Sequence, residues 1–166
     1  TLAKLLRKYF DTNIQCYDPF VRDPEPLVKY ISTEELSKYG LVINSAMFEH
    51  VRKREDLDKI NDLVSHNGVL MLHTVICENI PKDPDWFYLT PIVHTAFHTN
   101  KSMSFLMEQW GYSDSMYSPA AKSWFLFKDR NEAITKLPRM IENINVELQT
   151  EFLFHKTGFV DYWKGF

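Results

Sequence analysis

Two apolar runs on either side of an amphipathic segment constrain the fold of this chain more than any other feature. Residues 41–43 (Leu-Val-Ile) and 68–76 (GVLMLHTVI) are almost unbroken apolar sequence, which is typical of strands covered on both faces. The intervening residues 54–64 repeat apolar side chains, such as Leu57 and Ile60, at helical spacing. A strand, a helix and a second strand in this order form a right-handed βαβ unit. The sequence therefore predicts a parallel sheet.

The flanking segments extend this alternation of helices and strands. In chain order, the sequence predicts a helix at 2–10, short strands at 13–17 and 27–31, a helix at 103–110 closed by Gly111, and a hairpin of strands 112–117 and 123–127. We interpret Asn67-Gly68 as the stop of the 54–64 helix, and Pro138 as an interruption of the C-terminal helical sequence.

We therefore expect an α/β fold with a doubly wound, mostly parallel sheet, a C-terminal antiparallel hairpin and C-terminal helices. Residues 1–128 are expected to form the α/β domain, and residues 129–166 a helical extension docked on it. The Phe-rich end, residues 152–154 and 159–166, is too apolar for a free tail. We expect it to dock on the core or on a partner, including a second copy of the chain.

Composition narrows the class of partner. The 166 residues carry 19 Lys and Arg against 22 Asp and Glu, a formal net charge of -3, so no positive field favours nucleic acid or an anionic membrane. The apolar runs are far shorter than the ~20 residues that span a bilayer. Cys16 and Cys77 lie far apart without a CxxC pattern, which favours free thiols in the cytoplasm.

An acidic residue lies where a nucleoside would bind in such a sheet. Ligands of doubly wound sheets bind at the carboxyl ends of strands, and a carboxylate about 20 residues after a glycine turn holds the ribose hydroxyls. Asp18 follows the predicted strand at 13–17 and matches this place. Counting back puts the glycine turn just before Thr1. The alternative, which Asp18 taken alone favours, is a side chain that caps the turn before Pro19.

Several segments in the same order carry a family resemblance. Residues 44–51 (NSAMFEHV), directly after the apolar run at 41–43, resemble the strand-and-EH segment of class I S-adenosylmethionine-dependent methyltransferases, especially the small-molecule branch. Residues 61–76 and 98–112 resemble that family's next helix and strand and its helix before the closing hairpin. The resemblance covers roughly residues 1–128 and implies a Rossmann-like methyltransferase fold. The family's glycine-rich first motif is absent from the 166 residues, so this fold is expected to be incomplete at its N-terminus.

The resemblance also implies a set of contacts to the donor, S-adenosylmethionine. The residues expected to bind it are Asp18 at the ribose, Pro19 and Phe20 beside the adenosine, Ile31 and Ser32 near the adenine, and Ser45, Ala46 and Met47 along the methionine and sulfonium end.

Methyl transfer to oxygen or nitrogen needs a base for the acceptor's proton, and histidine titrates in the appropriate range. His50 follows the segment expected at the sulfonium and is the first catalytic residue that we predict, with His98 second. An alternative of equal weight is a structural turn in which Glu49 caps a helix and His50 bonds the backbone.

Residues 78–98 are rich in proline and aromatic side chains, which suits a lid over the carboxyl edge of the sheet. The residues expected to line an acceptor pocket are His73, Trp86, Tyr88 and His94, although a His73 that is satisfied by the backbone is an equal alternative. His94 and His98 are four positions apart, as metal ligands on a helix are. Thr95 replaces the glutamate of H-E-x-x-H and no third ligand is evident, so the sequence predicts no metal site.

These observations predict an enzyme that transfers a methyl group to a hydroxyl or amine of a sugar, a lipid precursor or a secondary metabolite. The alternative is a catalytically inactive methyltransferase-like binding module or partner subunit. A nicotinamide-dependent dehydrogenase would also use Asp18, but none of the eight tyrosines has the lysine four positions later that its short-chain branch needs. Hydrolysis is disfavoured because the sequence contains no G-x-S-x-G elbow.

Overall fold

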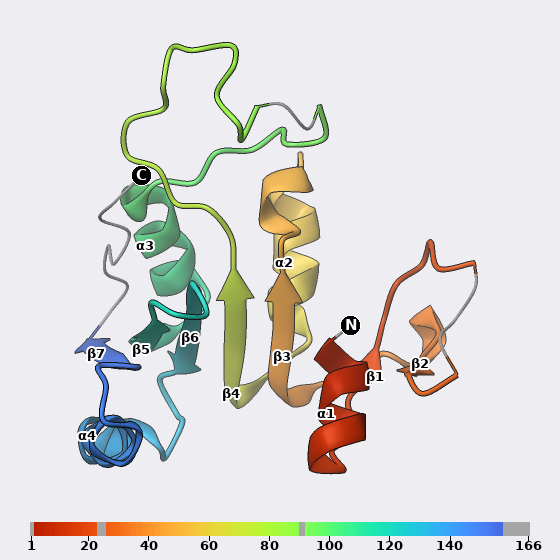
Figure 1. Cartoon of the computed structure of the whole chain (residues 1–166). Helices are drawn as coiled ribbons and strands as arrows, with labels where there is room; N and C mark the ends of the chain where they lie inside the picture. The colour runs from red at the N-terminus through yellow and green to blue at the C-terminus, as the bar shows by residue number, and fades with distance from the viewer. Residues whose placement is uncertain (1, 23–25, 90–91, 158–166) are drawn as a thin grey trace. The chain divides into compact units, whose positions relative to one another are not determined.

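A computed structural model describes residues 2–22, 26–89 and 92–157 of the chain (Figure 1). The chain separates into two compact units, residues 1–37 and residues 38–166, and each unit is described by itself. Residue 128, the expected end of the α/β domain, lies inside the second unit.

The first unit contains one helix and a pair of short strands. Helix α1 (Leu2–Phe10) occupies the predicted range. It is followed by β1 (Gln15–Cys16), β2 (Lys29–Tyr30) and the 3-10 helix η1 (Thr33–Glu35). Strands β1 and β2 pair in parallel. Both predicted strands are confirmed, although each is shorter than the apolar sequence around it.

The second unit is built on a five-stranded mixed sheet. Its strands are β3 (Tyr39–Ser45), β4 (Val64–His73), β5 (Tyr112–Ser118), β6 (Ser123–Lys128) and β7 (Phe154–Thr157). The spatial order is β3-β4-β6-β5-β7. Only β3 and β4 are parallel, whereas β4 with β6, β6 with β5 and β5 with β7 are antiparallel. The α/β class and the hairpin β5–β6 are therefore confirmed, but a mostly parallel sheet is not.

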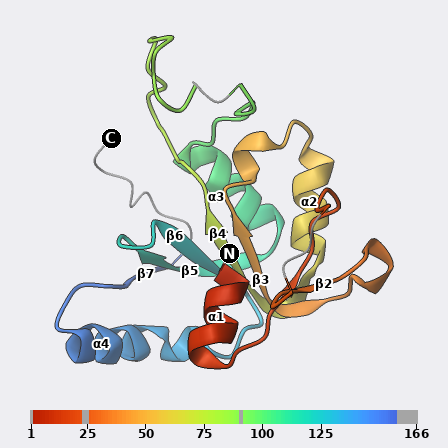
Figure 2. The same cartoon turned by 45° about the vertical axis from the view of Figure 1, so that its right-hand side comes forward.

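Helices pack on both faces of this sheet (Figure 2). Helices α2 (Arg54–Asp62) and α3 (Asn100–Gln109) cover one face, and α4 (Leu137–Leu148) covers the other. Strand β4 alternates between the faces, because Leu70 and Leu72 belong to the core under α2 and α3 while Val69 packs against the core under α4. The rest of the first core includes Phe48, Leu57, Ile60, Met103, Met107, Trp124 and Leu126, and the second includes Met116, Phe127, Leu137, Ile141 and Leu153.

The predicted stop at Asn67-Gly68 is wrong. Helix α2 ends at Asp62 and β4 begins at Val64, so both residues lie inside a strand. A Cβ atom on Gly68 would lie 2.8 Å from Ser65 Oγ and 3.1 Å from the carbonyl oxygen of Gly40. Glycine therefore serves close approach to the neighbouring strand at this position, rather than the end of a helix.

The interpretation of Pro138 as an interruption is also wrong. Pro138 lies in the first turn of α4, directly after the 3-10 helix η3 (Ile134–Lys136). Proline suits this position because the first turn leaves its backbone N–H groups without intrahelical acceptors, and the fixed φ of proline is already helical. Pro138 thus lies in the first turn of the helix that it was expected to break.

The described part of the C-terminal segment belongs to the second unit. Leu137, Ile141 and Leu153 pack with Met116 and Phe127, and β7 adds an edge strand to the sheet. The Phe-rich residues 159–166, where we expect contact with a partner, lie outside the described residues.

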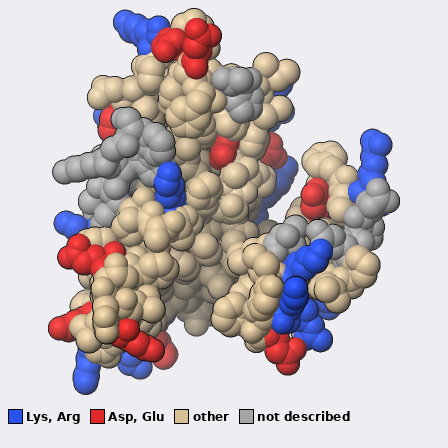
Figure 3. Space-filling view, viewed as in Figure 1, with Lys and Arg blue, Asp and Glu red and all other residues tan. Residues whose placement is uncertain are grey.

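No helix in the described part of the chain has the length and apolar character needed to cross a membrane. On the face seen in Figure 3, few charged side chains lie over β3 and β4.

Candidate functional site

The carboxyl ends of β3 and β4 lie side by side, and the chain leaves each of them through a different segment (Figure 1). After β3, a turn leads into the 3-10 helix η2 (Phe48–His50). After β4, the chain runs over the strand ends before it returns to α3. Ser45 is the register partner of His73, and the Ala46 N–H donates to the His73 carbonyl at 2.8 Å. This edge is where α/β sheets bind ligands.

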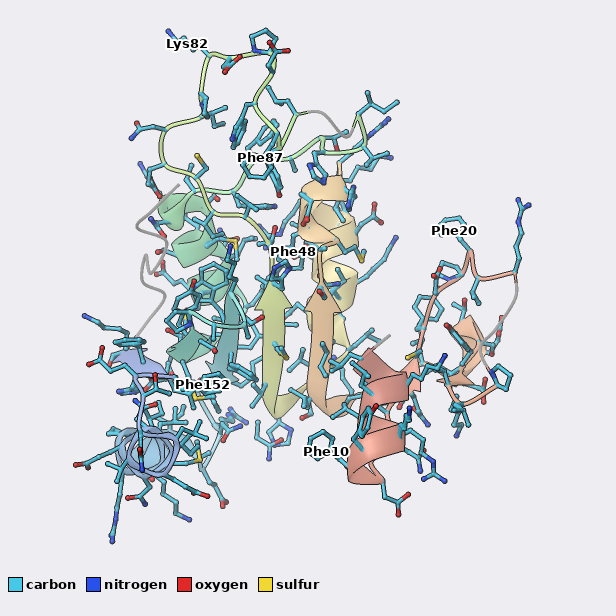
Figure 4. All side chains as sticks on the ribbon, viewed as in Figure 1. Phe10, Phe20, Phe48, Lys82, Phe87 and Phe152 are labelled. Carbon is cyan, nitrogen blue, oxygen red and sulfur yellow. The ribbon has the colours of Figure 1, made fainter. Side chains whose placement is uncertain are left out.

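The segment after β4 is anchored to η2 by backbone hydrogen bonds. The N–H groups of Thr95 and Ala96 donate to the carbonyl oxygen of Glu49 at 2.8 and 3.0 Å. At the base of the segment, the Cys77 N–H donates to the His98 carbonyl at 2.9 Å. Phe48 lies at the strand ends and Phe87 lies beyond it in the segment (Figure 4). These bonds fix the described part of residues 77–99 over the edge of the sheet.

Aromatic rings of this segment pack against one another. The ring of Trp86 lies 5.3 Å from that of Tyr88 and 5.9 Å from that of Phe97, measured between centroids. The ring of Tyr88 lies 4.3 Å from that of His94. Three of the residues predicted to line an acceptor pocket, Trp86, Tyr88 and His94, are thus brought together.

The most buried charged group at this edge is Glu49, whose exposed fraction is 4%. The hydroxyl of Thr74, just after β4, donates to Glu49 Oε2 at 2.9 Å. Among the ion pairs of the described residues, none includes Glu49. Sequence reasoning assigned Glu49 only a capping role and gave Thr74 no role. The available signal was the position of Thr74, one residue beyond the strand end.

His50 and His94 face each other across this edge. Their ring centroids are 4.9 Å apart. His50 Nδ1 lies 3.1 Å from the carbonyl oxygen of Val93, and His94 Nδ1 lies 2.7 Å from that of Tyr88. A carbonyl oxygen only accepts, so in each ring Nδ1 donates and Nε2 carries the lone pair. Both histidines therefore present a basic nitrogen.

Glu49, His50 and His94 form a compact group. One carboxylate oxygen and one nitrogen from each ring lie within 4.8 Å of one another. Sequence reasoning had paired His94 with His98 and found no third ligand. The structure instead brings His94 to two residues that lie some forty-five positions earlier in the chain. We call Glu49, His50 and His94 the Glu-His-His cluster.

His98, predicted as the second catalytic residue, is buried behind this cluster. Its Nε2 lies 3.3 Å from the Phe48 carbonyl, and its ring centroid lies 5.8 Å from that of Phe48. Burial lowers the pKa of His98, and this effect outweighs the opposing effects of the hydrogen bond to Phe48 and the charge of Glu49. His98 is therefore held as a neutral ring that links η2 to the start of α3.

Tyr88 contributes a hydroxyl that stays protonated. Burial, together with the negative charge of Glu49, raises the pKa of Tyr88 to about 12. At neutral pH the phenol is thus a hydrogen-bond donor and not a base. His73, also predicted to bind substrate, has a buried Nδ1 without a hydrogen-bond partner among the described residues, and so does Asn44 Oδ1. The alternative was a His73 ring that is hydrogen-bonded to the backbone. Among the described residues, no backbone group bonds to its Nδ1.

The residues expected at the methionine end of a donor occupy the turn after β3. Ala46 has a φ of +52°, a left-handed conformation that is uncommon for residues other than glycine. Met47 Sδ accepts a hydrogen bond from Asn44 Nδ2 at 3.3 Å. Ser45, Ala46 and Met47 are all exposed. The turn is thus a tight, solvent-facing end of a strand.

The other residues expected at the donor belong to the first unit. Asp18 follows β1, and its Oδ1 accepts from the Phe20 N–H at 2.9 Å, so Asp18 does cap the turn that contains Pro19. Ile31 and Ser32 follow β2. The Ile31 N–H donates to the Cys16 carbonyl at 2.9 Å. All five residues therefore lie at the carboxyl ends of a parallel strand pair.

Two surface hollows lie away from these residues. One, of about 630 Å³, lies on α4, and the other, of about 460 Å³, lies near the start of β4 and the end of β6. The second includes Lys128, which donates to Asn61 Oδ1 at 2.8 Å and to the Trp110 carbonyl. Burial is the main reason why the pKa of Lys128 is lowered. These bonds give Lys128 a structural role.

The Glu-His-His cluster and its aromatic cover have the chemistry of an active site or a metal centre: a buried carboxylate, two basic nitrogens and a phenol donor meet at a ligand-binding edge. No protein-family model matches the chain, and no curated protein matches it at a significant level.

Proposed function

We propose that this chain transfers the methyl group of S-adenosylmethionine to a hydroxyl or amine of a small molecule. The observation that supports this most is the convergence of Glu49, His50 and His94 with an aromatic segment at the carboxyl ends of two parallel strands. Rossmann-type sheets bind their ligands at that edge. A sugar, a lipid precursor or a secondary metabolite would each supply the nucleophile.

The second unit has features that agree with part of a Rossmann-like methyltransferase fold. Strand β3, helix α2 and strand β4 follow each other as a βαβ unit, and α3 precedes the closing hairpin β5–β6. Helices pack on both faces of the sheet. We propose that β3 and β4 belong to the parallel part of such a sheet.

The residues assigned to the donor in the first unit, considered by themselves, are chemically suited to the adenosyl part of that ligand. Asp18 offers an exposed carboxylate after β1, and Ile31 and Ser32 offer an apolar and a polar side chain after β2. The turn at 45–47 brings exposed backbone to the end of β3. When bound, S-adenosylmethionine supplies an electrophilic methyl group on a sulfonium.

His50 has the geometry of a proton acceptor for this reaction. Its Nδ1 is engaged by Val93, so its Nε2 lone pair is directed elsewhere. The acceptor's O–H or N–H proton passes to Nε2, a new bond forms between the acceptor and the methyl carbon, and the S–C bond breaks with its electron pair left on sulfur. The nearby Glu49 carboxylate stabilises the imidazolium that results. The aromatic rings of Trp86 and Tyr88 hold the acceptor in line.

A binding module that performs no methyl transfer is the second candidate. One observation favours it: the Asp18 carboxylate is already used in a turn. Such a module would use the aromatic segment to bind a small molecule or a partner protein.

Calorimetric titration with S-adenosylmethionine and with its demethylated product separates these candidates. A methyltransferase binds both, and it transfers labelled methyl groups to at least one member of a panel of sugars, phenols, lipid alcohols and amines. His66→Gln, at an exposed histidine in β4, is the matched control and should leave binding unchanged. Absence of binding to both compounds would overturn the methyltransferase proposal and favour the binding module.

A further inference from the structure

We propose that Glu49, His50 and His94 bind one divalent transition-metal cation of the Zn²⁺ type. The three residues come from η2 and from the segment after β4, and their ligand atoms lie within 4.8 Å of one another. No sequence pattern predicts this set, because Glu49 and His50 are distant in sequence from His94.

The donor set selects the class of metal. Two imidazoles and one carboxylate are ligands that catalytic Zn²⁺ sites use, with a water in the fourth position. Imidazole nitrogen suits Zn²⁺, Fe²⁺ and Ni²⁺ better than it suits Mg²⁺ or Ca²⁺, which prefer oxygen ligands. Three protein ligands leave a coordination position for water or for an oxygen of the acceptor.

Hydrogen bonds to backbone carbonyls orient the two imidazole rings for metal binding. Metal-bound histidines almost always donate their second ring N–H to a carboxylate, a backbone carbonyl or a water, which fixes the tautomer. His50 and His94 both have Nδ1 at a backbone carbonyl, that of Val93 and that of Tyr88 respectively. The two Nε2 atoms are therefore the nitrogens that would take the cation.

The carboxylate gives an independent reason for a cation here. Glu49 is 4% exposed, and its side-chain partner among the described residues is the neutral hydroxyl of Thr74 at 2.9 Å. Buried charges in proteins are paired or coordinate metals, because an isolated buried carboxylate is costly. None of the ion pairs among the described residues provides Glu49 with a basic partner. A cation held by His50 and His94 provides that compensation.

The three ligand atoms need to move only slightly closer together to bind one cation. Ligand atoms about 2.1 Å from a tetrahedral Zn²⁺ are roughly 3.4 Å from one another, somewhat closer than the present limit of 4.8 Å. Glu49 is fixed by Thr74, and the two rings are in contact with a centroid distance of 4.9 Å.

The role of the cation in catalysis rests on the proposed methyl transfer, whereas the binding of the cation does not. In the metal-free chain His50 accepts the acceptor's proton. In the loaded chain His50 is a ligand, and the cation lowers the pKa of the hydroxyl that it binds. That hydroxyl proton leaves to solvent water, the O–C bond to the methyl group forms, and the S–C bond breaks with its electron pair left on sulfur.

The test is cation binding measured without donor or acceptor. Purified chain is dialysed against a chelator, titrated with Co²⁺, and followed by visible absorption and by metal content after desalting. We expect one Co²⁺ per chain, displaced by Zn²⁺. His50→Ala, His94→Ala and Glu49→Gln should each weaken the affinity by about 10- to 1000-fold, since each removes one of three ligands. His66→Gln is the matched control and should bind as the unaltered chain does.

Three outcomes are decisive for this proposal. Loss of binding in the His50 and His94 variants with unchanged circular dichroism supports the site, even if Glu49→Gln fails to fold. Absence of Co²⁺ binding, or binding that survives both histidine substitutions, overturns it. Methyl transfer that continues at full rate in the presence of chelator overturns the catalytic role of the cation alone, and so separates failure of this role from failure of the proposed function.

Discussion

Thr74 donates its hydroxyl hydrogen to Oε2 of Glu49 across 2.9 Å, and the two residues, twenty-five positions apart, are 1% and 4% exposed. This bond connects the chain just after β4 to η2, which follows β3. It therefore couples the two segments that leave the parallel strands. It also orients the carboxylate at the centre of the Glu-His-His cluster.

Thr74→Val tests this coupling. Valine keeps the shape of threonine but removes the donor, so the buried carboxylate loses a hydrogen bond and stability should fall by about 1–3 kcal/mol. Chemical denaturation measures the change, and Thr74→Ser, which keeps the hydroxyl, is the control. Equal stability of the valine variant and the unaltered protein would show that the bond contributes nothing.

Substitution of Gly68 tests the close approach of β3 and β4. Gly68→Ala puts a Cβ atom 2.8 Å from Ser65 Oγ, 2.9 Å from Val64 Cγ1 and 3.1 Å from the Gly40 carbonyl oxygen, so neighbouring atoms must move. We expect a loss of about 1–3 kcal/mol, as for other overpacked sites. Gly40→Ala is the matched control, because no atom lies within 4 Å of its added Cβ. Similar melting temperatures for both variants would contradict the steric explanation.

The buried His98 predicts a pH dependence of stability. Its pKa is lowered in the folded protein from the ordinary value of 6.5, chiefly by burial. Between the lowered pKa and 6.5 the unfolded chain binds more protons than the folded chain, so stability falls as the pH drops below 6.5 and levels off below the lowered pKa. Melting temperatures between pH 8 and pH 4 should show this loss. It should become smaller in His98→Phe and remain in the exposed-site control His66→Gln.

Asp18→Asn separates the turn from ligand binding. Asparagine keeps an Oδ1 that can accept from the Phe20 N–H, so the turn after β1 should persist. The substitution removes the charge that would bind the ribose hydroxyls, and affinity for S-adenosylhomocysteine should fall about ten- to hundredfold. Calorimetry on both proteins gives the comparison. If affinity is unchanged, Asp18 acts only in the turn.

Local patterns predicted the elements whose signal is local. The apolar spacing of α1 and α3 and the turn between β5 and β6 lie within a few residues of sequence, and the structure confirms all of these elements. The start of β4 was missed because Asn67-Gly68 was interpreted as the stop of the preceding helix. The strand begins at Val64, which pairs with Tyr39 of β3, and the register shifts before Leu41 pairs with Val69. That pairing is non-local, so no periodicity within the segment reveals it.

The candidate site was predictable in its parts and not in its combination. The strand ends and the aromatic segment indicated His50, Tyr88 and His94 as candidates, because ligands bind at that edge. Which histidines meet depends on the described part of residues 77–99, where the N–H groups of Thr95 and Ala96 bond to the Glu49 carbonyl. The four-residue spacing of His94 and His98 suggested a shared helical face, but the structure has no helix there and turns His98 inward.

The final prediction concerns His50. Its Nε2 atom is the one that we propose accepts the acceptor's proton or binds the cation. His50→Ala removes it, and turnover should fall roughly 10²- to 10⁴-fold, the usual contribution of general acid–base catalysis. Donor affinity should change little, because His50 is not among the residues assigned to the donor. The bond from Nδ1 to Val93 is lost as well, so melting temperature must be measured on the same sample.

His50→Asn is the companion variant, because its amide can donate to the Val93 carbonyl but offers no comparable base. Turnover that stays low in both variants while stability recovers in His50→Asn assigns His50 to the chemistry. Turnover that recovers together with stability assigns it to the anchoring of the segment after β4.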